Sequence, residues 1–294
     1  MELFAFAAAL SWATASLFAS APARHLGGFH FSRLRMSLMG VAMLPIVGLS
    51  SSLSDIEPWV GLVLLSAFVG IVLGDVSMFA CMARLGPRRT GVLFAANAPL
   101  TAALNVVVFD ISYGVVVILG AAMVSVGVVI AIWFGRKPSG AFNPDEATTG
   151  TLLIGVSLGL LAALGQASGA LLIKPVVDAG IDPWLISALR VAASAVMMQL
   201  IYAVFRSRFP MTTQPMNSQL WLGLAMSGLL GMTLGMSFLL VAFSKGDVGV
   251  ASILSATTPV VILPLLWLKN RERPALMAWV GAALCVLGSA LIIG

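Results

Sequence analysis

Residues 66–74 read Ser-Ala-Phe-Val-Gly-Ile-Val-Leu-Gly, and residues 227–235 read Ser-Gly-Leu-Leu-Gly-Met-Thr-Leu-Gly. The two stretches share one serine and two glycines at identical spacing, and each lies inside a long apolar run. Glycines four positions apart lie on one face of a helix, where they allow a neighbouring helix to approach closely. The two stretches therefore indicate an apolar helical unit that occurs twice in the chain.

Further segments repeat in the same order, which indicates an internal duplication of the whole unit. They align when the chain is shifted by about 154–161 residues. The matching pairs are Leu34-Arg35-Met36 with Leu189-Arg190-Val191, Asn97-Ala-Pro99 with Thr257-Thr-Pro259, and Gly120-Ala-Ala through Gly127 with Gly281-Ala-Ala through Gly288.

The composition requires a lipid bilayer as the main solvent. Hydrophobic residues make up 60% of the 294 positions and charged residues 9%, whereas a soluble domain carries roughly 25% charged residues. A helix needs about 20 consecutive apolar residues to cross the hydrocarbon core. Ten such spans are predicted, at about 2–20, 31–49, 58–82, 90–109, 114–134, 150–173, 183–205, 218–242, 248–268 and 275–293.

The basic residues predict how these spans are oriented, because cytoplasmic loops are enriched in Lys and Arg. The loops after the odd-numbered spans hold eleven of them, and the even-numbered loops with both termini hold two, Lys174 and Lys245. The odd-numbered loops are therefore expected in the cytoplasm and both termini outside it. In a bacterial inner membrane both termini would be periplasmic.

The predicted fold class is all-α, a polytopic membrane protein with ten transmembrane helices in two inverted five-helix repeats. Residues 1–137 form the first repeat, residues 138–149 a hydrophilic linker, and residues 150–294 the second repeat. Because five is odd, the second repeat enters the membrane with the opposite orientation. Inverted repeats place a solute site near the midplane between the halves, and one half rocks against the other. The architecture predicts a secondary transporter that functions as a monomer.

These features give the chain a resemblance to the drug/metabolite transporter superfamily, in particular to its EamA-type ten-helix members. The resemblance covers nearly the whole chain. It rests on an aromatic or amide residue in the first helix of each half, an arginine in the second, a glycine-rich third, a proline-centred fourth and the Gly-Ala-Ala motif of the fifth. The residues outside the glycine motifs are Trp12 and Gln166, Arg35 and Arg190, and Pro99 and Pro259.

The resemblance implies that small metabolites cross the membrane through a central cavity by alternating access. It favours the YddG-type branch of amino-acid exporters, and hence export of amino acids with broad specificity. The 15 methionines suit an adaptable cavity. Many EamA-type members have a Gly-Glu pair before the last helix of a half, whereas this sequence has Asp110 and Arg271-Glu272.

Asp75 is the one carboxylate well inside a predicted span. An ionised Asp there costs roughly 2.5–3.5 kcal/mol unless it is paired. Arg35 lies about one turn inside its own span, in the same half of the bilayer, so a structural Arg35–Asp75 ion pair is the favoured interpretation. A proton-coupling role for Asp75 is the alternative.

Arg190 is the repeat equivalent of Arg35, but Met236 occupies the position that matches Asp75. The Arg190 guanidinium therefore has no acidic partner within its pair of spans. Its long side chain could reach the headgroups or pair with Asp178 or Asp182. Alternatively it attracts the carboxylate of a substrate, for which its planar fork is suited.

Pro99 and Pro259 interrupt the fourth helix of both halves at equivalent positions. Each frees a backbone carbonyl about one turn earlier, near Ala95 and Ser255. Paired interruptions point to a transporter binding site, although a purely structural kink gives the same sequence. The polar residues expected to satisfy the freed carbonyls or line the cavity are Asn97, Asn105, Ser255, Thr257 and Thr258.

Trp12 and Gln166 occupy the same position in the two first helices, where they either pack against a neighbour or line the cavity. The predicted cavity residues are Trp12, Asn97, Pro99, Gln166, Arg190, Ser255, Thr258 and Pro259, with Arg35 and Asp75 as an ion pair or proton site.

Other function classes find little support in the sequence. The net charge of +5 is scattered between apolar runs, which argues against nucleic-acid binding. Cys81 and Cys285 lie in apolar segments without a neighbouring His, so neither a metal site nor a disulfide is expected. His25 and His30 belong to the first loop, and no enzyme motif accompanies them. Without a phosphate-binding loop, no ATP or other cofactor is expected.

The expected partners are therefore the solute and the lipid bilayer. Proton-coupled efflux of cationic drugs is a weaker alternative, because the first helix has only Glu2, at its edge, in place of a buried carboxylate. A membrane scaffold without a cavity is the remote alternative.

Overall fold

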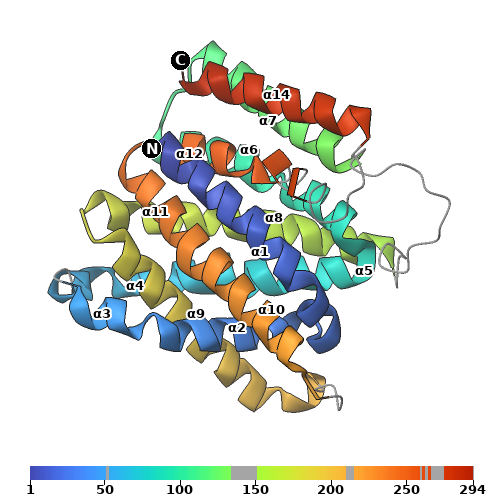
Figure 1. The fold of residues 1–294 in the computed structure, drawn as a ribbon. Coiled ribbons are helices and arrows are strands. Elements are labelled where there is room, and N and C mark those ends of the chain that lie inside the picture. Colours follow the sequence, from blue (N-terminus) through green and yellow to red (C-terminus); the bar gives the residue numbers. More distant parts are fainter. Residues whose placement is uncertain are drawn as a thin grey trace.

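The computed structural model describes residues 1–50, 53–133, 151–209, 215–258, 260–261, 264–265 and 275–293. Every regular element within these residues is a helix (Figure 1). Nine helical segments among them are long and apolar enough to cross a membrane, and they match nine of the ten predicted spans. The remaining span, 248–268, is described in part, while the predicted linker 138–149 and Pro259 lie outside the described residues.

The first repeat contains helices that join end to end within some spans. They are α1 (Glu2–Leu26), α2 (Gly28–Ala42), α3 (Leu44–Leu49), η1 (Ser54–Trp59), α4 (Val60–Ser66), η2 (Ala67–Leu73), α5 (Gly74–Phe94), α6 (Asn97–Phe109) and α7 (Val115–Trp133).

The second repeat follows the same order in its described part. Its helices are α8 (Leu152–Asp178), α9 (Pro183–Val204), η4 (Arg206–Arg208), α10 (Ser218–Gly228), η5 (Leu229–Gly235), α11 (Met236–Ser244), α12 (Val248–Ser255) and α14 (Leu276–Ile293).

The first helix extends past its predicted span of about 2–20, because α1 continues through Pro22 and ends at Leu26. The chain then turns at Gly27, whose φ of 73° favours glycine. Pro22 leaves the carbonyl of Phe18 without its helical donor. A β-carbon at Gly223 of α10 would lie 2.9 Å from this carbonyl oxygen. A bare glycine thus packs against the irregular turn and accommodates it.

The connection between the predicted spans 58–82 and 90–109 is helical and not a loop, because α5 runs from Gly74 to Phe94. The chain nevertheless folds back inside this segment. Thr90 Oγ1 donates a hydrogen bond to Cys81 Sγ at 3.3 Å, although nine residues of a straight helix span about 13.5 Å. Helical geometry therefore continues around the reversal between the third and fourth spans.

The two repeats pack as a pseudo-twofold pair. The second helices contact each other (α2 with α9), as do the fourth (α6 with α12) and the fifth (α7 with α14). The first helix of each repeat instead packs against the third span of the other, so that α1 contacts α10, η5 and α11 while α8 contacts α4, η2 and α5. Each of these contacts thus occurs together with its symmetry mate.

The inversion is visible in α7 and α14, which lie side by side at one edge of the molecule (Figure 1). A β-carbon at Gly120 would lie 2.7 Å from the carbonyl oxygen of Gly288, and one at Gly127 would lie 2.6 Å from that of Gly281. Gly120 corresponds to Gly281 in the repeat, and Gly127 to Gly288. The start of each motif therefore meets the end of the other, which defines an antiparallel pair.

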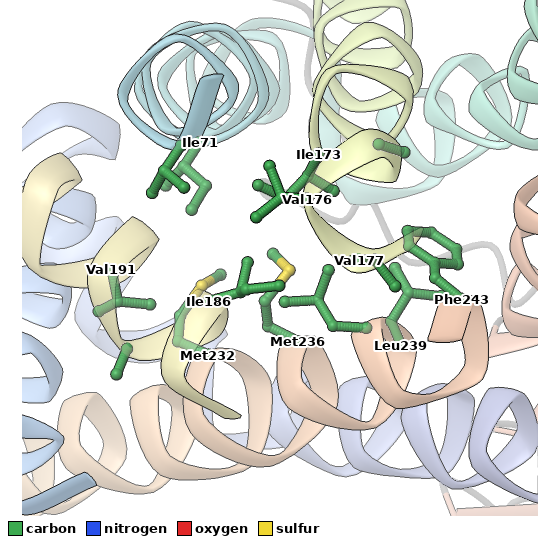
Figure 2. Packing of buried hydrophobic residues seen from close by; sticks show 14 of the residues in the cluster. Ile71, Ile173, Val176, Val177, Ile186, Val191, Met232, Met236, Leu239 and Phe243 are labelled. Carbon is green, nitrogen blue, oxygen red and sulfur yellow. The ribbon is translucent and has the colours of Figure 1, made fainter. Parts of the chain in front are cut away.

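The main apolar core lies between the two repeats. Figure 2 shows Ile71 of η2 in the same cluster as Ile173 of α8, Ile186 of α9 and Met236 of α11. Residues of α1 and α2 complete the cluster from the first repeat. The repeats are therefore held together by a shared core, and the polar side chains discussed below stand out against this apolar background.

Candidate functional site

The third span of each repeat is π-helical at its middle, in η2 and η5. These are the two glycine-containing stretches that reveal the duplication. Short π-helical turns are rare and frequent at functional sites. A β-carbon at Gly169 of α8 would lie 2.6 Å from Gly70 Cα, so the glycines let the first helix of one repeat press directly on the π-helix of the other.

Trp12 and Gln166 lie at corresponding places in this arrangement, and both are half-buried. Trp12 Nε1 donates a hydrogen bond of 2.9 Å to the Gly231 carbonyl of η5. A β-carbon at Gly74 would lie 3.6 Å from the backbone nitrogen of Gln166. Trp12 thus fastens α1 to the π-helix of the opposite repeat, and a role of either side chain in lining a cavity stays a prediction.

Arg35 and Asp75 are brought together between α2 and the start of α5. Arg35 Nη2 lies 2.6 Å from Asp75 Oδ2, and the Ser32 hydroxyl donates to the same oxygen at 2.8 Å. The guanidinium also lies over the rings of Phe31 and Phe79, at 4.9 Å and 5.3 Å from their centroids. The carboxylate is therefore engaged by two donors in an apolar setting.

Arg190 lies at the equivalent place in the second repeat, facing a thioether where Arg35 faces a carboxylate. Its Nη1 lies 3.4 Å from Met236 Sδ, and a β-carbon at Gly70 would lie 3.1 Å from its Nη2. The guanidinium thus reaches the π-helix η2 of the other repeat. Only 3% of the residue is exposed, and its Nε has no hydrogen-bond partner among the described residues.

The proposed acidic partners of Arg190 are engaged elsewhere. Asp178 pairs with Lys174, and Asp182 accepts a hydrogen bond from the backbone of Trp184 as the cap of α9. Because Arg190 is buried, it also does not reach toward headgroups. Within the described residues no carboxylate forms an ion pair with this guanidinium.

The fourth spans are interrupted at matching positions. A turn at Ala95–Ala96 precedes α6, and a turn at Ala256–Thr257 follows α12. Asn97 Nδ2 donates to the Phe94 carbonyl at 2.6 Å, and its repeat equivalent Thr257 donates through Oγ1 to the Leu254 carbonyl at 2.7 Å. The two breaks are therefore built in the same way.

The remaining polar residues of these spans also bond to local carbonyls. Thr258 Oγ1 donates at 2.8 Å to the carbonyl of Ser255, which Pro259 leaves without a helical donor, as the sequence suggested. Ser255 donates at 2.9 Å to the Ser252 carbonyl. These hydroxyls satisfy backbone carbonyls at the interruption of the helix. Contact of a solute with Ser255, Thr258 or Pro99 stays a prediction.

Asn105 was expected to bond to the carbonyl freed near Pro99 or to line the cavity, but it does not bond to that carbonyl. It lies buried at the far end of α6, where its Nδ2 donates to Tyr113 Oη at 2.8 Å and to Asp247 Oδ2 at 2.7 Å. Tyr113 Oη also donates to Asp247 Oδ1 at 2.7 Å. Sequence reasoning missed this cluster, although an Asp one residue before the helix start at Val248 is a usual capping signal.

No group of three or more potential metal ligands occurs among the described residues. Cys81 and Cys285 are both buried and unbridged. Between the repeats, Arg190 is a buried charged group for which the described residues supply no ion pair.

The fold and these groups define a polytopic helical membrane protein of two related halves with a buried cation between them. The model of the EamA-like transporter family matches residues 1–133 and 153–294. The chain belongs to this family, which indicates a transporter of the drug/metabolite type. It is accordingly an integral membrane protein.

The comparison with solved structures agrees with this fold. One crystal structure of a protein superposes with a TM-score of 0.79, covering 98% of this chain and 94% of that chain at 19% sequence identity. At this identity the likeness shows the fold alone. No curated protein matches the chain significantly.

Proposed function

We propose that this transporter moves small metabolites that carry a carboxylate, amino acids foremost and with broad specificity, by alternating access between its two repeats. The proposed direction is export from the cytoplasm of a bacterial cell, with both termini on the periplasmic side of the inner membrane. The protein would act as a monomer, because the two repeats within one chain supply both halves of the pathway.

The observation that carries the substrate class is the buried guanidinium of Arg190. A charge removed from water is costly unless it is paired. The first repeat meets this cost with Asp75, whereas the second repeat has Met236 in the equivalent place. A solute carboxylate would supply the missing counter-charge, and Arg suits a carboxylate because its fork can make two parallel hydrogen bonds.

The same geometry disfavours efflux of cationic drugs. A cation would need a free carboxylate in the membrane, but Asp75 is held by Arg35 and Ser32. The Arg190 side chain would also repel a cation near the π-helix η2. An anionic or zwitterionic solute is therefore the better match to the charges between the repeats.

Flux into proteoliposomes tests this proposal. Radiolabelled amino acids should be taken up by wild-type protein, whereas the corresponding amino-acid amides, which lack the carboxylate, should be poor substrates. Arg190→Ala should lower the apparent affinity for amino acids about 10- to 100-fold, the equivalent of one hydrogen bond to a charged group. Arg190→Lys should retain part of the affinity.

Arg208→Ala is the matched control, because this arginine is exposed on η4, away from the repeat interface. It should leave flux unchanged. Equal uptake of amino acids and their amides, or unchanged affinity in Arg190→Ala, would show that the guanidinium does not recognise a carboxylate.

A further inference from the structure

The face of the molecule at which both chain ends lie carries a pair of short helices from opposite repeats. We call this end the terminal face: Met1 contacts Gly246 there, and Ile292 of α14 contacts Gly120 near the start of α7. At this face α6 and α12 pack against each other (Figure 1). A β-carbon at Gly249 of α12 would lie 3.1 Å from Ala102 Cα of α6, so the two backbones are in close contact.

Each of these helices is the half of an interrupted span that lies toward the terminal face. The interruptions are the turns at Ala95–Ala96 and Ala256–Thr257, which lie at the opposite ends of α6 and α12 from the terminal face. A helix interrupted in this way can tilt about its break with little loss of backbone hydrogen bonds, because Asn97 and Thr257 already satisfy the local carbonyls. The two turns have the character of hinges.

The ends of α6 and α12 at the terminal face are joined by a polar cluster, the clasp, formed by Asn105, Tyr113 and Asp247. Three hydrogen bonds of 2.7–2.8 Å connect them. The bonds from Asn105 and Tyr113 to Asp247 join the two repeats, and the bond from Asn105 to Tyr113 lies within the first repeat. Asp247 Oδ1 also accepts from Val250 N at 2.9 Å, which caps α12. Burial raises the pKa of Tyr113, so its hydroxyl stays protonated and donates at neutral pH.

The other face of the molecule has no counterpart of the clasp in its sequence. When the two repeats are aligned with a shift of about 160 residues, Leu265 corresponds to Asn105, Gly86 or Pro87 to Asp247, and Arg273 or Pro274 to Tyr113. The equivalent positions therefore contain no amide, phenol or carboxylate side chain. The duplication is therefore not symmetric in these three residues, which lie where the two repeats would have to separate to open a pathway.

We propose that α6 and α12 form a hinged gate at the terminal face and that the Asn105–Tyr113–Asp247 clasp, its latch, keeps this gate closed. In the structure the clasp is formed and the gate is closed. Opening toward the terminal face requires the clasp to break and the two helices to swing apart at their turns. Since the sequence provides the residues of this clasp at the terminal face and no equivalent set in the other repeat, the clasp favours the conformation closed at the terminal face when no solute is bound.

The test measures access to a thiol beneath the gate and uses no solute, so its result is independent of whether the protein carries carboxylates. Ala98 is 2% exposed and packs with Ile253 of α12 in one apolar cluster. Ala98→Cys is introduced into a background in which Cys81 and Cys285 are replaced by alanine. The protein is reconstituted in nanodiscs, and the rate of modification by a charged methanethiosulfonate reagent is followed.

Tyr113→Phe and Asp247→Asn should each raise this rate about tenfold or more, since each loses a hydrogen bond to or from a charged group in the closed state alone. Asn at 247 retains a capping side chain for α12, so the change reports on the clasp. Asn105→Leu, which copies the equivalent residue of the other repeat, should act in the same direction.

Tyr202→Phe is the matched control, because this second tyrosine lies on α9 beside Arg33, away from the clasp. It should leave the rate unchanged. Rates in Tyr113→Phe and Asp247→Asn that equal the control would overturn the latch. A rise in Asp247→Asn without a rise in Tyr113→Phe would show that the bond from Tyr113 to Asp247 does not hold the gate closed, and would equally contradict the proposal.

Discussion

Two arginines at equivalent positions have opposite surroundings, and this contrast defines the site at the scale of single residues. Arg35 contacts a carboxylate and a pair of aromatic rings, whereas Arg190 contacts the sulfur of Met236 and the bare backbone at Gly70. The second repeat has no carboxylate at the position that matches Asp75. Under our proposal the Arg190 guanidinium binds the carboxylate of a solute instead.

The first pair is expected to act in stability. Asp75→Asn leaves the buried Arg35 charge without its counter-charge and should destabilise the protein by about 3–5 kcal/mol. The double variant Arg35→Met with Asp75→Leu removes both charges and should recover most of this loss. Thermal unfolding in detergent measures both effects, with Asp55→Asn at an exposed position as the control.

Transport by Asp75→Asn distinguishes the structural role from proton coupling. If the pair is structural, the folded fraction of this variant should keep the wild-type dependence of flux on a pH gradient. A variant that folds but no longer responds to the gradient would assign Asp75 to the coupling pathway instead.

Met236→Asp should rebuild the lost ion pair in the second repeat. The new carboxylate would lie beside Arg190, as Asp75 lies beside Arg35, and would occupy the guanidinium in place of a solute. We expect the thermal midpoint to hold or rise while amino-acid uptake falls at least about tenfold. Met236→Leu is the control of similar volume. Unimpaired uptake by a folded Met236→Asp protein would contradict the assignment of Arg190.

At the scale of helices, glycine contacts determine how the repeats fit together. The third spans accept the first helices of the opposite repeat at their π-helical turns, and α7 and α14 meet through crossed glycine motifs. The sequence predicted close helix contacts at the third spans, because glycines at helical spacing recur there in both halves, but it did not predict which helices meet. It did not predict the π-helices, since an inserted residue in a helix leaves no periodic signal in a uniformly apolar segment.

Gly127→Ala should weaken the antiparallel pair of α7 and α14. The new β-carbon would lie 2.6 Å from the Gly281 carbonyl oxygen, a distance that forces the helices apart and costs about 1–3 kcal/mol. Gly61→Ala is the control, because a β-carbon there meets no atom within 4 Å. The thermal midpoints of the two variants should differ, and equal midpoints would contradict the close packing at Gly127.

Helix boundaries were predicted less well than helix positions. The first span was predicted to end at about residue 20, but α1 continues to Leu26, since in the membrane a proline is tolerated when a neighbour such as Gly223 closes over the freed carbonyl. The predicted spans 58–82 and 90–109 left a connection between them, and the chain instead reverses within the helix α5. Both errors arise because tertiary contacts, which the sequence does not display, decide how a break is accommodated.

At the scale of the molecule, the all-α membrane fold, the duplication and the inversion could be predicted from the sequence, because lipid requires long apolar helices and an odd number of spans inverts the second copy. The proximity of Arg35 and Asp75 could also be predicted, since buried charges in lipid have few partners. The Asn105–Tyr113–Asp247 clasp could not, because its members lie in turns or helix ends far apart in sequence and their polarity alone is unremarkable there.

Two repeats that share one core and one latch are expected to move as alternating halves around Arg190. A carrier of this kind must return between outward and inward states, and a solute on the far side speeds this return. Alternating access therefore predicts that the protein exchanges a solute molecule inside the vesicle for one outside, which neither a channel nor a scaffold does.

Counterflow in proteoliposomes measures this most directly. Vesicles loaded with an unlabelled amino acid should accumulate the labelled amino acid transiently above its equilibrium level, and vesicles loaded with its amide should not. At amino-acid concentrations that suffice for the wild type, Arg190→Ala should strongly reduce the transient accumulation, in line with its lower apparent affinity. Labelled uptake that is independent of the internal solute, or that is equal for amino acid and amide, would contradict the account.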